Sequence, residues 1–275
     1  MDLRPMLAQL YGATDGPDSL LMRLVNDTAE TLASAHVSVS WGDRLLTLDK
    51  SAGFKQELTF ETGFASIRGS HVYDQYNGPD AIAWRLNTLV WAGRRACQIG
   101  GEFVECGTFK GDMAWVILNT IGAERISRFW LFDSFEGFSP NYSNAEDFPE
   151  SPRFLEFANG FYRQPGLYEY VGARFEPFAN VTLVKGFLPE ALDAEAPDHI
   201  GFLHVDLSSP RAEIAVLERL FDRVLAGGAV VFDDYGWMMF HKQKEAEDDF
   251  MRRRGYAILE LPTGQGLVVK RYLPR

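Results

Sequence analysis

Residues 102–112 read Glu-Phe-Val-Glu-Cys-Gly-Thr-Phe-Lys-Gly-Asp, and this stretch decides the fold. A short apolar run ends at residue 106, and two glycines then bracket a turn that leads into helical spacing over residues 111–121. A strand, a glycine turn and a helix form the repeating unit of open α/β domains. Ligands of such domains bind beyond the carboxyl ends of the strands, so this turn is a candidate site.

The same alternation continues along the chain. Apolar runs over residues 129–132, 181–184, 202–205 and 229–232 predict four more strands, and helical spacing over residues 210–225 precedes the last of them. Near-continuous apolar strands that alternate with amphipathic helices predict a parallel sheet covered on both faces.

The last part of the chain breaks this rhythm. Residues 256–261 and 266–270 have strand patterns joined by Pro262-Thr263-Gly264-Gln265. So short a link cannot make a parallel crossover, so this pair must be antiparallel. We therefore predict an α/β, Rossmann-like domain: a mostly parallel seven-stranded sheet that ends in a C-terminal antiparallel hairpin.

The first part of the chain follows a different pattern. Residues 36–40 and 45–48 flank Gly42-Asp43, which predicts a short hairpin, and a helix is expected from residue 79 to about 97. We divide the chain into an N-terminal extension over residues 1–75, an element for acceptor binding or oligomerisation, and a main domain over residues 76–275.

Composition narrows the class of partner. The 275 residues carry 38 acidic and 27 basic side chains, a net charge of −11, which opposes binding to DNA or RNA. No apolar run approaches the roughly 18–20 residues of a membrane span, and the N-terminus does not resemble a secretory signal. Cys97 and Cys106 lack zinc-type spacing. We expect a cytoplasmic protein without a membrane or nucleic-acid partner, and a homodimer stays open.

Two acids near the first strands indicate the kind of ligand. The turn lacks the G-x-G-x-x-G fingerprint that a pyrophosphate favours, and Glu105 places a carboxylate there instead. A carboxylate opposes a phosphate and suits a cationic ligand, such as a sulfonium with its amino group. Asp133 ends the second strand, where an acid can accept hydrogen bonds from both ribose hydroxyls. An ordinary strand-to-helix turn is the alternative.

Three more acids end the fourth and fifth strands. Asp206 follows the fourth strand, and Asp233 and Asp234 follow the fifth. Adjacent strands would bring these carboxylates together, where they repel one another unless a hard divalent cation such as Mg²⁺ binds them. The alternative is that one or two of them cap helices or pair with Arg or Lys.

His204 and two aromatic residues complete the candidate set. His204 lies two positions before Asp206 and should project from the same face of the strand. It could orient a carboxylate, contact a ligand, or be a satisfied interior histidine. Tyr235 and Trp237 follow the acid pair and are candidates for an acceptor pocket.

Taken together, these motifs resemble the macrocin O-methyltransferase family, which belongs to the class I methyltransferases that use S-adenosylmethionine. The matching elements are Gly101 to Gly107 with Lys110-Gly111, Phe132 to Gly137, His204 to Leu207, Gly227-Gly228, Phe232 to Gly236, and Leu261 to Gly266. They occur in the right order over about residues 98–270, and their combination is specific although each motif alone is not.

The resemblance implies a cofactor site and a metal site. The implied cofactor-binding residues are Glu105, Cys106, Gly107, Thr108, Phe109, Lys110 and Gly111 around the methionine portion, Asp133, Ser134 and Phe135 at the ribose, and Lys185, Gly186 and Phe187 beside the adenine. Asp206, Asp233 and Asp234 would hold Mg²⁺. Ser208 departs from the family pattern, since family members often carry a second acid there.

The function expected from this resemblance is Mg²⁺-dependent O-methylation of a small hydroxylated acceptor, such as a sugar or aromatic group of a secondary metabolite. Asp206 is the first candidate for the general base and His204 the second. Three alternatives stay open: an NAD-dependent Rossmann oxidoreductase, a non-catalytic methyltransferase-like binding module, and a nucleoside-dependent enzyme with other chemistry.

Overall fold

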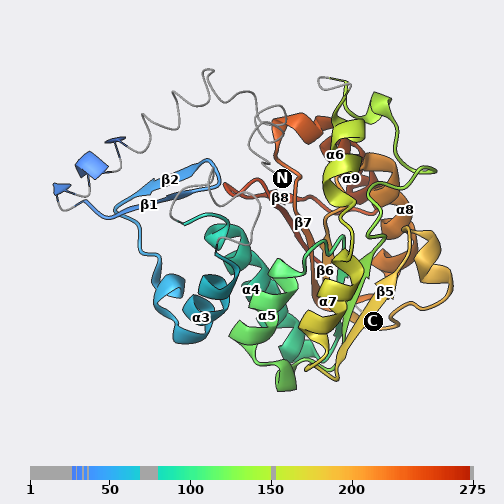
Figure 1. Cartoon of the computed structure of the whole chain (residues 1–275), viewed down its shortest axis with the longest axis horizontal. Coiled ribbons are helices and arrows are strands. Elements are labelled where there is room, and N and C mark those ends of the chain that lie inside the picture. Colours follow the sequence, from blue (N-terminus) through green and yellow to red (C-terminus); the bar gives the residue numbers. More distant parts are fainter. Residues whose placement is uncertain are drawn as a thin grey trace.

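The structure, a computed structural model, describes residues 27–28, 30–32, 34–35, 37–68, 80–149 and 153–272. A seven-stranded sheet forms its centre (Figure 1), in the order β5-β4-β3-β6-β7-β9-β8. The strands are β3 Glu102–Cys106, β4 Phe129–Asp133, β5 Val181–Lys185, β6 Ile200–Val205, β7 Val224–Phe232, β8 Leu259–Glu260 and β9 Gly266–Val269. The first five of these are parallel, and β9 pairs antiparallel with both β7 and β8.

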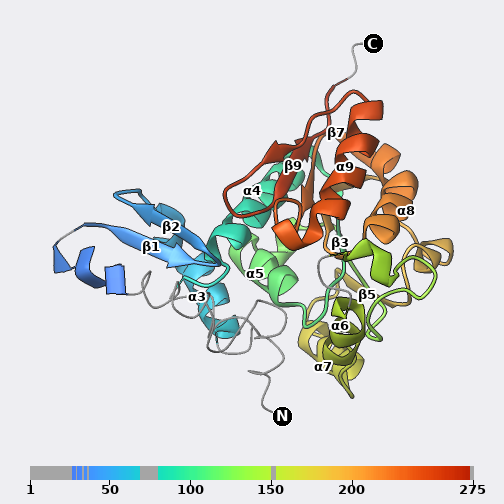
Figure 2. The ribbon, with the colours of Figure 1, turned by 90° about the horizontal axis from the view of Figure 1, so that it is seen from above.

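Helices cover both faces of this sheet, as Figure 2 shows from above. One face packs against α4 Ala83–Ile99, α5 Asp112–Ile121 and α7 Leu167–Phe175, and α3 Leu58–Ile67 packs on the outside of α5. The other face packs against α8 Pro210–Leu220 and α9 His241–Arg253. The helix α6 Phe154–Tyr162 belongs to a separate small aromatic cluster.

Alternation along each strand sorts side chains between the two faces. On β6, Phe202 packs on the α4 side, whereas Leu203 and Val205 pack on the α8 side. On β7, Val231 packs on the α4 side and Val230 on the α8 side. His204, the next residue on the α4 side of β6, therefore lies where the apolar face meets the carboxyl ends of the strands.

The predicted sheet and terminal hairpin are confirmed, with differences at the element ends. Strand β7 begins at Val224, not at residue 229, because α8 ends at Leu220 and a single turn of 3₁₀ helix separates the two. Strand β8 is limited to two residues at the open edge of the sheet, where Leu259 is exposed. Very short strands are common at sheet edges, where a strand has hydrogen-bond partners on one side only.

The predicted N-terminal hairpin is also confirmed. It comprises β1 Val39–Gly42 and β2 Leu45–Leu48, which pair antiparallel beside α3 and α4 (Figure 1). The expected boundary between residues 75 and 76 and the expected start of a helix at residue 79 lie outside the described residues. Among the helices of the described part, none is long and apolar enough to cross a bilayer.

Candidate active site

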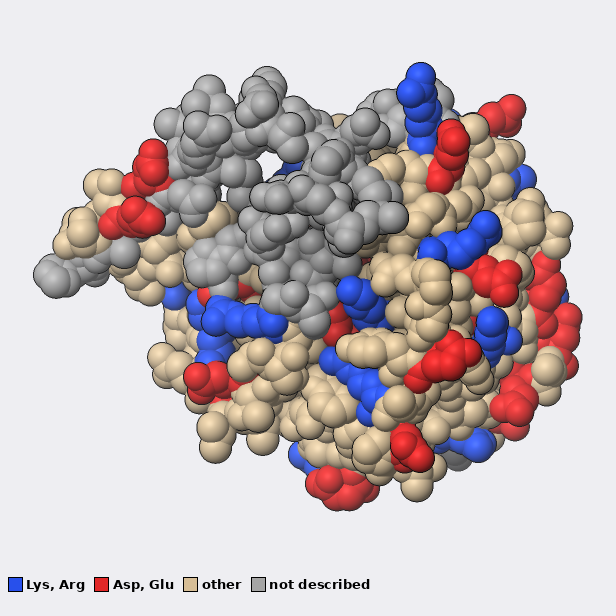
Figure 3. Space-filling model, viewed as in Figure 1, with Lys and Arg blue, Asp and Glu red and all other residues tan. Residues whose placement is uncertain are grey.

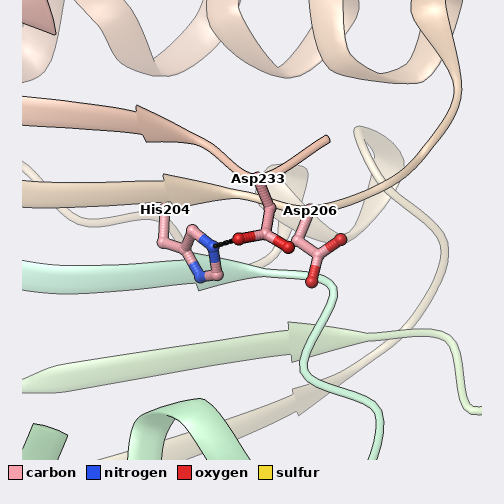
Figure 4. Close-up of side chains that lie close together, drawn as sticks. All are labelled: His204, Asp206 and Asp233. Carbon is pink, nitrogen blue, oxygen red and sulfur yellow. Dashed lines mark ion pairs between the residues drawn. The ribbon is translucent and has the colours of Figure 1, made fainter. Parts of the chain in front are cut away.

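A line of polar side chains crosses three adjacent strands at their carboxyl ends. In register on β3 and β6, Glu105 faces His204, and Asp233 follows the end of β7. His204 Nδ1 lies 3.2 Å from Glu105 Oε1, and its Nε2 lies 3.5 Å from Asp233 Oδ1. All three side chains are almost completely buried, and Figure 4 shows His204 directed at Asp233. The imidazole is thus held between two carboxylates.

These contacts determine the charge of His204. Burial disfavours the imidazolium, but the hydrogen bonds and charges of Asp233 and Glu105 outweigh burial and raise the pKa of His204 to about 10. At neutral pH the ring is therefore cationic and holds the two acids in place.

Asp206 lies one residue beyond β6 and is partly exposed. Ligand atoms of His204, Asp206 and Asp233 all lie within 4.8 Å of one another (Figure 4). Across the described part of the chain, the Asp206 carboxylate has no hydrogen bond and no ion pair. Burial and the neighbouring Asp233 and Asp234 raise its pKa well above the ordinary range. Asp206 is thus a free carboxyl group with an affinity for protons or cations.

Asp233 and Asp234 differ from Asp206 because they are already partnered. Asp233 accepts hydrogen bonds from Arg85 Nη1 at 2.5 Å and from Gln265 Nε2 at 2.9 Å. Burial alone would raise its pKa, but the charge of Arg85 holds the pKa of Asp233 well below its usual range. Asp234 accepts from the Ser208 hydroxyl at 2.9 Å, and burial together with Asp233 raises its pKa to about 6.

The three predicted acids, Asp206, Asp233 and Asp234, are named here the acidic centre. Asp234 is not part of the group with His204, because its carboxylate is turned toward Ser208 and toward Arg85 Nη1 at 3.4 Å. Ser208 thus occupies the position of the expected second acid and donates a hydrogen bond to the centre.

Arg85, from α4, is the central residue that the sequence prediction missed. Besides Asp233 and Asp234 it contacts Asp43 in the turn of the N-terminal hairpin, with Nε 2.5 Å from Asp43 Oδ2. Arg85 shares the apolar stripe of α4 with Leu89. A charged side chain on an apolar helix stripe indicates an interior group with an ionic partner. The position of Arg85 on this stripe is therefore a sequence signal that could have identified it. No local pattern distinguishes Gln265.

The glycine turn after β3 packs directly against the acidic centre. A Cβ atom on Gly107 would lie 1.8 Å from the carbonyl oxygen of Asp206, and the φ of Gly107 is +94°. Glycine is therefore required at this position by contact with the chain as well as by backbone conformation. Within the part of the chain that the structure describes, no partner within hydrogen-bond geometry reaches the buried Oε2 atom of Glu105 or the buried Oγ1 atom of Thr108.

Asp133 holds this turn in place. Its Oδ2 accepts hydrogen bonds from the backbone N–H groups of Thr108 at 2.9 Å and Phe109 at 2.7 Å, and its Oδ1 accepts from Phe135 at 2.6 Å. Burial raises the pKa of Asp133, and these three donors oppose the shift. The carboxylate ties β4 to the loop after β3.

Most of the other predicted cofactor residues lie in the loops at the carboxyl edge of the sheet, and Cys106 is the exception. Gly111, with φ +75°, is the N-cap residue of α5, and Gly186 donates its N–H to the backbone oxygen of Asp133 at 2.9 Å, so both lie at the same edge of the sheet. Lys110 lies in the loop between β3 and α5, and Phe187 lies in the loop after β5. Lys185 is exposed, and the Ser134 hydroxyl donates to the backbone oxygen of Gly137 at 2.7 Å. Cys106 packs on the α8 side, away from the acidic centre, and burial raises the pKa of its thiol far above the ordinary value.

The two predicted acceptor residues have different surroundings. Tyr235 is buried in the α8-side core, and its hydroxyl donates to Asp248 at 2.6 Å. Trp237 is half-buried, and the guanidinium groups of Arg85 and Arg44 lie 4.9 and 5.6 Å from its ring centre. Trp237 therefore borders the acidic centre, whereas Tyr235 connects β7 to α9.

The sheet order, the loop after β3 and the acids at the strand ends define a Rossmann-like domain of the methyltransferase type. The family model described as Macrocin-O-methyltransferase (TylF) matches residues 85–258, more than half of the chain, so this chain belongs to the macrocin O-methyltransferase family.

Individual relatives are more distant. A 4'-O-methyltransferase of Streptomyces olivaceus, which acts on 8-demethyl-8-(2,3-dimethoxy-α-L-rhamnosyl)-tetracenomycin C, is 25% identical over 179 residues, which span 62% of this chain and 66% of that protein, just under two thirds of its length. The O-methyltransferase NovP aligns with a TM-score of 0.57 and 20% identity over 68% of this chain and 80% of NovP. The calicheamicin methyltransferase CalS11 aligns with a TM-score of 0.53 and 18% identity over 80% of this chain and 93% of CalS11. The two structural likenesses show the fold.

Proposed function

We propose that this protein transfers the methyl group of S-adenosylmethionine to a hydroxyl of a sugar or aromatic group on a small secondary metabolite. The observation that carries the proposal is the polar line Glu105–His204–Asp233 with the free carboxylate of Asp206 beside it, in a chain of the macrocin O-methyltransferase family. The tetracenomycin relative is a 4'-O-methyltransferase of a rhamnosyl-bearing substrate, which supports a sugar acceptor.

The residues around the glycine turn fit S-adenosylmethionine. Among the described residues, Glu105 Oε2 has no donor within hydrogen-bond geometry, and the ammonium group of the cofactor would supply one. The neighbouring Thr108 hydroxyl can donate to the Glu105 carboxylate or accept from the ligand. S-adenosylmethionine supplies, when bound, a methyl group on a positively charged sulfur. Asp133 keeps lone pairs for ribose hydroxyls while it holds the turn, and Gly186 borders the adenine side.

The charges of the centre fit an additional cation. Among the side chains that the structure describes here, the carboxyl groups outnumber the cations: Asp43, Glu105, Asp206, Asp233 and Asp234 face Arg85, His204 and Arg44. Excess negative charge in a partly desolvated site is costly unless cations bind there. We propose that Asp206, Asp233 and Asp234 hold Mg²⁺, a hard cation that prefers such oxygen ligands. When bound, it would lower the pKa of a coordinated acceptor hydroxyl.

The side chains of this centre then have separate tasks. Asp206 accepts the proton of the acceptor hydroxyl, because its carboxylate is free and lies at the rim of the site. His204 keeps Glu105 and Asp233 in position between β3 and β7. Trp237 forms one wall of the acceptor pocket and partly excludes water from it.

Binding of cofactors tests the proposal directly. We expect calorimetric titration to show binding of S-adenosylmethionine and none of NAD⁺, and Glu105→Gln to weaken the former at least 10-fold. Glu102→Gln is the matched control, because Glu102 lies at the opposite end of the same strand. Binding of NAD⁺ in place of S-adenosylmethionine would support the oxidoreductase alternative, and unchanged affinity in Glu105→Gln would remove the role of Glu105.

The partners, the location and the oligomeric state of the protein are part of the same proposal. On the face shown in Figure 3, acidic and basic side chains are interspersed, and the net charge of −11 fits a small-molecule acceptor better than a nucleic acid. We propose a homodimer in the cytoplasm, with residues 1–75 contributing to acceptor binding or to oligomerisation. Sedimentation equilibrium at micromolar concentration tests the dimer, and a monomer mass would contradict it.

A further inference from the structure

Arg85 lies between Asp233 and Asp234 on one side and Asp43 on the other, and both sides bind its guanidinium group. On one side its Nη1 contacts Asp233 Oδ2 at 2.5 Å and Asp234 Oδ1 at 3.4 Å. On the other side its Nε and Nη2 contact the two carboxylate oxygens of Asp43 at 2.5 and 3.4 Å. The side chains of Arg85 and Asp43 are each about 10% exposed. One guanidinium therefore joins the N-terminal hairpin to the acidic centre.

The same oxygens are needed by Mg²⁺. Asp206 is free, but Asp233 and Asp234 each have one oxygen directed at Arg85. A guanidinium and a divalent cation repel each other at such short separations, and they compete for the same lone pairs. Full coordination by the acidic centre therefore requires Arg85 to move toward its other partner.

Asp43 is held in a position where it can bind Arg85. Asp43 and Arg44 form the turn between β1 and β2, and both have left-handed backbone conformations, with φ of 52° and 61°. Non-glycine residues adopt this conformation at a cost, so the surrounding hairpin must hold them there. The hairpin is fixed to the start of α4, where Asp80 N–H donates to the Trp41 oxygen at 3.1 Å and Trp84 Nε1 donates to Ser40 Oγ at 2.9 Å. Asp43 is thus a fixed anion outside the centre.

We propose that Arg85 is a built-in competitor of Mg²⁺ for Asp233 and Asp234, and that Asp43 opens the metal site by drawing Arg85 away. This inference rests on the proposed metal site. The family match begins at residue 85 and does not include Asp43. The hairpin of this chain would therefore adjust the metal affinity of a centre that lies in the shared domain.

The two residues should have opposite effects on metal affinity, which makes the test sharp. Calorimetric titration of the full chain with MgCl₂, without cofactor, should show at least 10-fold tighter binding in Arg85→Gln and at least 3-fold weaker binding in Asp43→Asn. In the double variant, Asp43→Asn should change the affinity by less than 2-fold, because its effect acts through Arg85. Arg174→Gln is the matched control, since Arg174 forms a comparably buried pair with Asp112 outside the centre.

The outcomes separate the competition by Arg85 from the proposed Mg²⁺ function. Equal or weaker Mg²⁺ binding in Arg85→Gln overturns the competition, and an Asp43→Asn effect that is the same with and without Arg85 overturns the role of Asp43. If wild type binds no Mg²⁺, the proposed metal function fails. The competition is then supported only if Arg85→Gln gains binding, and it is overturned if that variant also binds none. Should Arg85→Gln not fold, Arg85→Lys, with fewer donors and the same charge, should still bind Mg²⁺ more tightly than wild type.

Discussion

Replacing Glu247 by glutamine should stabilise the protein at alkaline pH. Glu247 on α9 and Glu213 on α8 are fully buried and in contact with each other. Over the residues that the structure describes, one oxygen of each has no other partner within hydrogen-bond geometry. Glu213 Oε1 accepts the N–H of Leu207, next to Asp206, at 3.1 Å, and Gln243 Nε2 donates to Glu247 Oε1 at 3.3 Å. Two carboxyl groups in contact are compatible only if they keep a proton between them.

The magnitude follows from the pKa of Glu247. Burial, partly offset by hydrogen bonds to Glu213 and Gln243, raises this pKa from 4.5 to about 7. Since the folded state keeps this proton longer than the unfolded chain, the contribution is fully present below about pH 4.5 and is lost as pH rises through about 7. At about 1.4 kcal/mol per pKa unit, the loss at pH 8 is roughly 3 kcal/mol.

Urea unfolding at several pH values between 5 and 8 measures this effect. In Glu247→Gln the amide cannot ionise and can donate to Glu213, so its free energy of unfolding at pH 8 should exceed that of wild type by up to roughly 3 kcal/mol. At pH 5 the two proteins should agree within about 1 kcal/mol. Asp249→Asn is the control, because Asp249 lies on the same helix but is partly exposed. A Glu247→Gln protein that is less stable than wild type at pH 8 would refute the shared proton.

Three substitutions test the site itself. Asp206→Asn should lower kcat about 100- to 10,000-fold in a methyl-transfer assay while S-adenosylmethionine affinity measured by calorimetry changes less than about 3-fold, and full activity would exclude Asp206 as base. Gly107→Ala should lose about 3 kcal/mol or more of unfolding free energy in urea, because its Cβ would overlap the Asp206 carbonyl. The control Gly100→Ala, with the same left-handed backbone and no atom within 4 Å, should lose only about 1–2 kcal/mol. Ser208→Ala removes the donor to Asp234 and should weaken Mg²⁺ binding in calorimetry about 3- to 10-fold, an effect that tighter binding would contradict.

Much of the fold could be predicted because parallel strands are buried on both faces. The run over residues 102–106 is apolar apart from its two acids, and the structure forms a strand with those bounds. The ends of β7 and β8 were less predictable. Their lengths depend on pairing with partners, and at an open edge the pairing is not encoded in local periodicity.

The candidate site was predictable only for residues that end strands. Asp206 and Asp233 meet because adjacent parallel strands end at the same edge, which follows from the order of the elements. Arg85 reaches Asp233 from 148 positions away, and no local pattern specifies which helix delivers a cation there. Tyr235 follows the acid pair in the sequence, but its side chain packs in the core on the α8 side, a placement that proximity in the chain does not reveal.

The division between paired and free acids has a physical reason. Within the layer of the sheet, Glu105 and Asp233 are at most 2% exposed, and an unpaired charge at such depth would cost several kcal/mol. Both therefore need a cationic neighbour, which His204 supplies to each of them. Asp206 extends one residue past β6 to the partly exposed rim, where water or a ligand can solvate a carboxylate that the protein does not pair. In the described part of the molecule, the acid of this centre that has no partner is thus the one at the partly exposed rim.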